Sequence, residues 1–359
     1  MNLAVSKSSA QAEADYDKYI QKKIVFGLGL LILILVCSVW AVSIGPVHIP
    51  MKDIVKAILG KDAGSESTLV IVNMRLPVIV AAIVAGFGLA ISGAVMQTLL
   101  RNPLASPFTL GISHGAAFGA AISIVFLGAG IIQSNFSDAV TVNNLTVTTI
   151  GAFAGAIAGT IAIVMLAKWR GLSPEAVILG GIAMGALFNA GTMLVECFAT
   201  DTEVASIVFW LFGDVTRASW GQIGMMFGLI FIGFIYFMLN RWNYNALESG
   251  EEAAKGLGVN TESIRLVGMI ISSLIAAVTV SFLGIIGFIG LLAPHITRRI
   301  IGNDNRFLLF ISGLMGALIL LVSSTLSRIV IHPVILPVGI ITSFLGAPLF
   351  LYILARKRK

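Results

Sequence analysis

The sequence predicts an all-α polytopic membrane protein with about ten transmembrane helices. Of its 359 residues, 57% are hydrophobic and 11% are charged, whereas soluble proteins carry about 25% charged residues. The apolar runs are continuous instead of alternating, which favours membrane helices over a β-barrel. Because a helix needs about 20 apolar residues to cross a bilayer, little sequence is left for a soluble enzyme domain.

Ten apolar runs have the length and composition of membrane helices. One stretch, from Ile264 to Ile301, is too long for a single helix and must fold back near Gly284. We expect a tail at 1–23, a transmembrane domain at 24–355 and a basic tail at 356–359. The predicted spans are 24–44, 77–98, 108–127, 148–167, 175–196, 220–239, 264–283, 285–301, 307–327 and 338–355.

The cations predict the orientation of the chain. With both termini on one side of the membrane, most of the 23 Lys and Arg residues fall on that side. By the positive-inside rule, both termini are therefore cytoplasmic. The formal charge of +6 reflects this bias and does not indicate nucleic acid as a partner.

Two segments outside the spans are long enough to have a role. On the outer side, the apolar spacing of Val47–Leu59 predicts a short interfacial helix. On the cytoplasmic side, the loop at 240–263 holds a short acidic, alanine-rich turn between Gly250 and Gly258. Glycines commonly mark the ends of helices, so a short helix is expected there.

The residues needed for catalysis are missing. His48, His114, His295 and His332 are scattered, without the spacing of a metal site, and we expect them to be turn or cap residues. The Pro294-His295 pair is expected to cap the eighth span. Gly60-Lys61 is followed by aspartate, so the chain lacks a phosphate-binding loop and cannot hydrolyse ATP alone. We predict a protein that is not an enzyme and binds no cofactor.

Ion-coupled transport is the alternative function. Such transporters normally carry carboxylates within their spans, but Glu175 and Glu196 lie at the two ends of the fifth span and no carboxylate lies at a span centre. The energy for transport is therefore expected to come from a partner. A membrane-embedded enzyme would need clustered polar groups, and none are found.

Two sets of polar residues allow two interpretations each. Arg75 and Arg328, on the outer side against the charge bias, either receive a carboxylate from a partner or extend along the interface. Side chains on the fifth and tenth spans either line a pathway for a bulky solute or only pack helices. Among these, Asn189 favours a pathway, because a buried amide in hydrocarbon needs partners.

Several motifs in one order identify a resemblance. Arg75-Leu76-Pro77, Ser92 to Gln97, Arg101 to Pro107 and Leu110 to Ser113 resemble the FecCD-type permeases of ATP-binding cassette (ABC) importers for iron-siderophore, haem and cobalamin. In the second half the matching motifs are Gly287 to Leu291, Pro294 to Arg298, Leu336 to Gly339 and Leu345 to Pro348. The resemblance covers nearly the whole chain after residue 24.

The resemblance implies a type II ABC importer permease fold of ten spans with an inverted repeat. It implies three kinds of partner: two ATPase subunits that use the ATP, an extracytoplasmic substrate-binding protein, and a second permease, either an identical copy or a different chain. The protein would lie in the cytoplasmic (inner) membrane, with the translocation path at the dimer interface. The sequence does not decide which metal chelate is carried.

The resemblance also assigns residues. Arg75 and Arg328 match the arginines that receive glutamates of the binding protein. Asn102 and Leu104 match the cytoplasmic gate, although an Asn-Pro turn remains equally probable on turn chemistry. The path would include Met184, Asn189, Met193 and Thr342. The family's ATPase-coupling helices fall on Glu248, Gly250, Glu251, Ala254, Leu257 and Gly258.

Overall fold

The chain is helical almost throughout its described part. The computed structural model describes residues 2–44, 50, 52, 54, 56, 68–129, 144–169, 173–331 and 334–355. Within these ranges the β-structure is a single isolated bridge between Ile331 and Val334. The all-α prediction is therefore confirmed.

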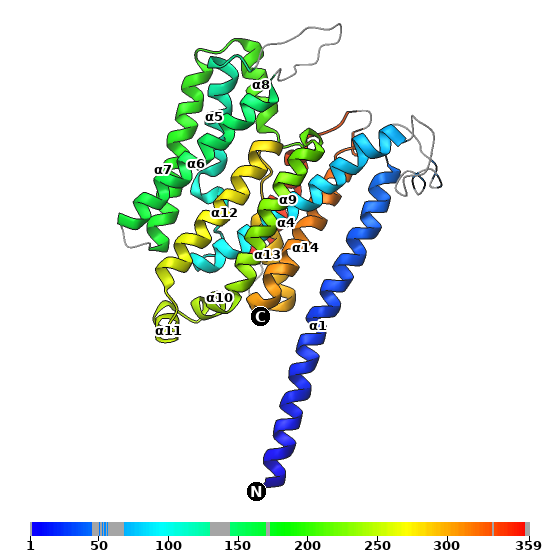
Figure 1. Ribbon diagram of the computed structural model, residues 1–359, viewed down its shortest axis with the longest axis vertical. Helices are drawn as coiled ribbons and strands as arrows, with labels where there is room; N and C mark the ends of the chain where they lie inside the picture. The colour runs from blue at the N-terminus through cyan, green and yellow to red at the C-terminus, as the bar shows by residue number, and fades with distance from the viewer. Residues whose placement is uncertain are drawn as a thin grey trace.

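Each of the ten predicted spans coincides with a helix (Figure 1). Seven helices of the described chain are long and apolar enough to cross a membrane, and α5 and α15 are shorter apolar helices. The tenth, α13, has 13 residues and belongs to neither group. The ten are α1 (Asn2–Ser43), α4 (Leu76–Leu99), α5 (Ile112–Phe126), α6 (Leu145–Trp169), α7 (Pro174–Glu196), α9 (Trp220–Leu239), α12 (Thr261–Leu283), α13 (Ile289–Ile301), α14 (Asn305–Leu326) and α15 (Val338–Ala355).

Short elements connect these helices. Most of the predicted interfacial helix at 47–59 lies outside the described residues, although Lys52, Ile54 and Lys56 are helical. The stretch at 2–23, expected as a tail, continues α1 as one helix of 42 residues. The connecting elements are η1 (Val70–Arg75, π-helical), η2 (Pro107–Leu110), α8 (Asp201–Leu211), η3 (Val215–Arg217), α10 (Arg241–Glu248) and α11 (Glu251–Gly256).

The two ends of the bundle differ. One end, called the basic end below, carries α10 and α11, and α1 projects beyond it (Figure 1). Four cations lie at this end because they pair with Glu248, Glu251 or Asp304: Lys23, Arg265, Arg298 and Arg306. The opposite end carries α8. The four named cations of the basic end are all held by carboxylates of that end.

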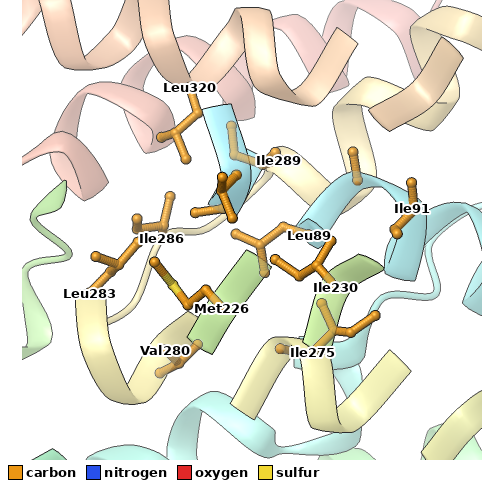
Figure 2. Close-up of a cluster of buried hydrophobic side chains, with 14 of the residues drawn as sticks. Leu89, Ile91, Met226, Ile230, Ile275, Val280, Leu283, Ile286, Ile289 and Leu320 are labelled. Atoms are coloured by element: carbon orange, nitrogen blue, oxygen red, sulfur yellow. The ribbon is translucent and has the colours of Figure 1, made fainter. Parts of the chain in front are cut away.

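Helix α4 is the centre of the fold. It packs against α9, α12, α13 and α14, and 83% of its most apolar stretch is buried. Figure 2 shows this core, where Leu89 of α4 meets Ile230 of α9 and Ile275 of α12. The helix is apolar on all sides because it is surrounded by other helices.

Glycines let the central helices approach closely. A Cβ atom at Gly93 of α4 would overlap the carbonyl oxygen of Gly290 of α13, and one at Gly86 would overlap that of Gly316 of α14. Apolar attraction between helices is absent in lipid, so close van der Waals contact of small residues holds such pairs together. These glycines therefore set the distances between α4 and its neighbours.

The predicted fold-back near Gly284 is confirmed, but the expected cap at Pro294-His295 is wrong. Helix α12 ends at Leu283, and Gly284 follows with φ of +76°. Pro294 lies inside α13, where proline removes a backbone hydrogen bond to the residue four positions earlier. The Gln97 side chain of α4 donates to that carbonyl, Gly290 O, at 3.5 Å, which compensates for the missing donor.

We expect Gly93→Ala to lower the thermal midpoint of the detergent-solubilised chain. The added methyl group would push α13 away from α4, and overpacking of this kind costs about 1–3 kcal/mol. Gly224→Ala on α9 is the control, because nothing lies within 4 Å of a Cβ at that position. Equal thermal midpoints for the two variants would contradict this account of the α4–α13 contact.

Candidate functional site

The loop between α9 and α12 folds into two short helices at the basic end. Gly250 and Gly258 enclose α11 with φ of +125° and +81°, a region that glycine enters at little cost. Ala254 is fully buried, whereas Leu257 is 73% exposed. The residues predicted for ATPase coupling therefore divide into a side that faces the bundle and a side that faces outward.

Glu248, the last residue of α10, is paired with Arg298 of α13. Their closest atoms, Glu248 Oε1 and Arg298 Nη1, are 2.6 Å apart. The other terminal nitrogen, Nη2, donates to the Thr98 hydroxyl of α4 at 2.9 Å and to Ala94 O at 3.4 Å. One carboxylate of the loop is thus joined through one guanidinium to the end of the central helix.

A second ion pair repeats this arrangement. Glu251 of α11 lies 3.1 Å from Nη2 of Arg265, whose side chain is 2% exposed. Arg265 Nε donates to Leu99 O, the last carbonyl of α4, at 3.2 Å. A charge-assisted hydrogen bond to a helix-end carbonyl satisfies an acceptor that has no partner within its own helix. We call Glu248, Arg298, Glu251, Arg265 and Thr98 the ionic network.

Helix α10 is also attached to α14. Asn245 donates to Asp304 Oδ1 at 3.0 Å, and its own Oδ1 accepts from the backbone N–H of Asn305 at 2.8 Å. Burial would raise the pKa of Asp304, but hydrogen bonds from Arg306 and Asn245 outweigh it and hold the pKa below its usual range. Asp304 is therefore a charged anchor for α10.

The ionic network also changes the acidity of Glu251. The hydrogen bond from Arg265, and after it the one from Lys255, lowers the pKa of Glu251 below its usual value. An acid with a lowered pKa stabilises the folded state above its unfolded pKa, and this contribution is lost as pH falls through the folded pKa. The attachment of α11 is therefore complete at neutral pH.

The predicted gate residues and one path residue share a groove. Asn102 and Leu104 follow α4 directly, and they line a groove of about 570 Å³ together with Asn189 and His114. Asn102 Oδ1 accepts from the backbone N–H of Leu104 at 2.9 Å, which is the turn role left open by the sequence. Asn102 therefore shapes this turn and also borders the groove.

The remaining predicted path residues lie elsewhere. Met184 is half-buried and Met193 is 58% exposed on α7, outside the groove. Thr342 is 2% exposed, and its hydroxyl donates to Gly339 O of its own helix at 3.1 Å. Thr342 is therefore occupied by an intrahelical bond in this conformation.

At the opposite end, the structure places Arg75 differently from the expectation of a surface cation. Arg75 is 4% exposed, and its Nη1 donates to Val42 O of α1 at 2.5 Å. Arg328 is half-buried, and its Nη2 has no hydrogen-bond partner among the described residues. Burial, and after it the charge of Arg75, lowers the pKa of Arg328. The two cations are thus close enough to repel.

Arg217 is a structural residue that the sequence did not single out. It donates to the carbonyls of Phe209, Trp210 and Phe212 at the end of α8. Arg265, Arg298 and His114 were also missed as site residues. A signal existed for the two arginines, because a buried guanidinium needs a carboxylate and the 240–263 loop supplies several.

No metal cluster accompanies the groove in the part of the chain that the structure describes. Within those residues, no three His, Cys, Asp or Glu side chains gather as a metal ion would require. The groove offers amide, imidazole and backbone groups, which can bind a solute by hydrogen bonds. It lies beside the end of α4, the end to which the ionic network is joined.

Comparisons with known proteins agree with this architecture. A model of the FecCD transport family matches residues 31–356. The chain is 53% identical to a candidate ABC transporter permease of Methanocaldococcus jannaschii, over 96% of this chain and 98% of the relative. It is 37% identical to an Fe(3+)-citrate import system permease protein of Bacillus subtilis, over 92% of this chain and 95% of the relative.

A solved structure shows the same fold. A candidate metal-chelate type ABC transporter in an inward-facing conformation superimposes with a TM-score of 0.77. The match covers 93% of this chain and 100% of the other, with 27% sequence identity. The arrangement of helices described above is therefore shared along almost the entire length of both chains.

We expect Arg265→Gln to speed hydrogen exchange of the α11 amides roughly tenfold, because a hydrogen bond to a charged group contributes about 1.5–3 kcal/mol. In the unchanged chain, protection should persist as pH falls, until it passes below the ordinary Glu pKa of about 4.3. In the Arg265→Gln variant, protection of the α11 amides should be lost at a higher pH, since the pKa of Glu251 is then less depressed.

Lys255→Gln is the matched control for this measurement. Lys255 is exposed and forms an i,i+4 pair with the same carboxylate, and such pairs contribute only about 0.2–0.5 kcal/mol. Exchange should therefore rise by about twofold at most. Equal exchange rates in the two variants would show that Arg265 does not anchor α11.

Proposed function

Because this chain belongs to the FecCD transport family, we propose that it is one of two permease subunits of an importer for a metal chelate. The chain is a multi-pass membrane protein and a permease of a metal-chelate ABC importer family. The chelate would be an iron-siderophore, haem or cobalamin-type compound. Separate ATPase subunits would hydrolyse the ATP, on the cytoplasmic side of the inner membrane, where both termini would lie.

The observation that carries this proposal is the attachment of α11 to the end of α4. Arg265 contacts both Glu251 of α11 and the carbonyl of Leu99, and only two residues separate Leu99 from Asn102 at the groove. A displacement of α11 would therefore act directly on the turn that borders the groove. This is the connection that an ATP-driven gate requires.

The surface of α11 fits an ATPase subunit. Around Leu257, the residues Glu252, Ala253, Lys255 and Gly256 are exposed as well, so a partner can contact the loop without displacing its buried side. In this proposal ATP binding closes the two ATPases, α11 moves with them, and the ionic network transmits the movement to α4. Helices then rock to open the groove alternately to each side.

Two further partners, a second permease and a substrate-binding protein, are proposed from exposed side chains of α7 and from Arg328. Helix α7 carries exposed Leu179, Ile182 and Leu187, and we propose that a second permease, an identical copy or a different chain, covers this face and encloses the groove. At the opposite end, Arg328 would receive a carboxylate of the substrate-binding protein. A carboxylate there would relieve the repulsion between Arg328 and Arg75.

Reconstitution tests the proposed function. Vesicles that contain the permease with its ATPase and binding protein should accumulate a ferric chelate when ATP is supplied. Vesicles that contain the permease alone should not accumulate the chelate under any ion gradient. Uphill accumulation by the permease alone would contradict the proposal and favour an ion-coupled transporter.

We expect Glu251→Arg to reduce ATP-dependent uptake by at least tenfold, because it places a second guanidinium against Arg265 and detaches α11. The thermal midpoint should fall as well, because the poorly hydrated charge of Arg265 loses its partner, so uptake is compared at equal amounts of folded permease. Glu262→Arg is the control, an equal charge change at an exposed position on α12. Normal uptake by the Glu251→Arg variant would rule out this coupling site.

We expect Arg328→Glu to abolish binding of the substrate-binding protein, measured by co-sedimentation with vesicles. Arg328→Lys should retain part of it, because the charge remains while the bidentate geometry is lost. Arg75→Glu is a less direct test, since Arg75 also bonds to Val42 O and the change should destabilise the fold. If Arg328→Glu binds normally, Arg328 is not a docking residue.

A further inference from the structure

A second groove lies at the basic end, between α1 and the rest of the bundle. It has a volume of about 370 Å³. Helix α1 provides one wall, with Ile24, Gly27, Leu28 and Leu31, and α9 and α14 provide the other. Only 22% of the most apolar stretch of α1 is buried in the chain. The groove therefore remains between a loosely covered helix and the core.

Aromatic side chains surround the mouth of the groove. Tyr16 and Trp242 contact Arg306, and Tyr19 contacts Lys23. The exposed fractions of Tyr16, Tyr19 and Trp242 are 48%, 45% and 57%. Exposed Tyr and Trp side chains are typical of the interface between membrane and water. From there the apolar lining leads along α1 toward the middle of the membrane, where hydrocarbon chains are the surrounding solvent.

The mouth of the groove carries a net positive charge. Lys23 and Arg306 both line it, and both are paired with one carboxylate, Asp304, at 3.5 Å and 2.7 Å. Two cations therefore face one anion. Lys23 is almost fully buried, whereas the Arg306 side chain is 24% exposed and is the cation within reach of a ligand.

Arg306 also has N–H groups that donate no hydrogen bond to the described residues. A guanidinium carries five N–H groups. In the described part of the chain, Nε and one N–H of Nη2 are donated to Asp304, and one N–H of Nη1 is donated to Tyr16 Oη at 3.2 Å. Two N–H groups remain, which is the number needed for bidentate binding of a phosphate.

From these contacts we infer that the groove binds a hydrocarbon chain of an anionic phospholipid, with the phosphate on Arg306. A protein helix is too large as the occupant. A cylinder of about 10 Å diameter that rises 1.5 Å per residue occupies roughly 120 Å³ per residue, so the groove would hold about three residues. The lining of the groove is apolar apart from Lys23 and Arg306 at its mouth, which suits a hydrocarbon chain, and the bound lipid would contact α1, α9 and α14 together.

Native mass spectrometry of the full chain in detergent tests this inference. Phosphatidylglycerol and phosphatidylcholine with identical acyl chains are the probes. We expect one retained lipid per chain and about a fivefold preference for phosphatidylglycerol, as one cation near the headgroup provides. Arg306→Gln should remove the preference, whereas Arg241→Gln, at a half-buried cation of α10 outside this groove, should retain it.

A pair of glycine variants tests binding of the hydrocarbon chain independently of phosphate binding by Arg306. A Cβ at Gly27 would make an ordinary 3.6 Å contact with Ile311, and one at Gly29 would meet nothing within 4 Å. Gly27→Leu should fill the groove and abolish lipid retention, while Gly29→Leu should leave it unchanged. These variants decide the question even if Arg306→Gln fails to fold.

Two results would overturn the inference. Equal retention of the two lipids by the unchanged protein would show that Arg306 does not bind the lipid phosphate. Equal lipid retention by the Gly27→Leu and Gly29→Leu variants would show that no hydrocarbon chain of the lipid binds in the groove.

Discussion

The close contact of α4 with α13 and α14 is the constraint on which the other features depend. Lipid supplies no apolar force between helices, so the glycines at this contact provide the attraction through close van der Waals packing. With its sides buried, α4 behaves as a rigid rod inside the bundle. The two ends of α4 then carry the polar contacts at the two ends of the bundle.

Those two ends carry the features that concern function. Arg75 lies at the start of α4, close enough to Arg328 for their charges to interact. At its far end, Thr98 and the carbonyl of Leu99 receive the two arginines of the ionic network. Both sets of contacts are therefore made to the same helix, which would give the proposed binding-protein docking and the proposed ATPase contact a shared physical route.

The ionic network explains why the 240–263 loop holds a defined position. A surface ion pair contributes little because water competes for both partners, but the side chains of Arg265 and Arg298 are 2% and 14% exposed. Removing one partner of such a pair leaves a poorly hydrated charge, which is costly. The loop is thus attached strongly enough to transmit movement, while Leu257 stays free for contact.

The sequence by itself determined the helical class, the positions of the ten helices that coincide with the predicted spans and the break at Gly284, because the cost of exposing backbone to lipid leaves few alternatives to helices. Only the tertiary structure decided which polar residues meet. Glu248 and Arg298 are 50 residues apart in sequence, and Arg75 is buried because α1 covers it. Such contacts depend on how the helices pack, and neither spacing nor composition along one chain records that packing.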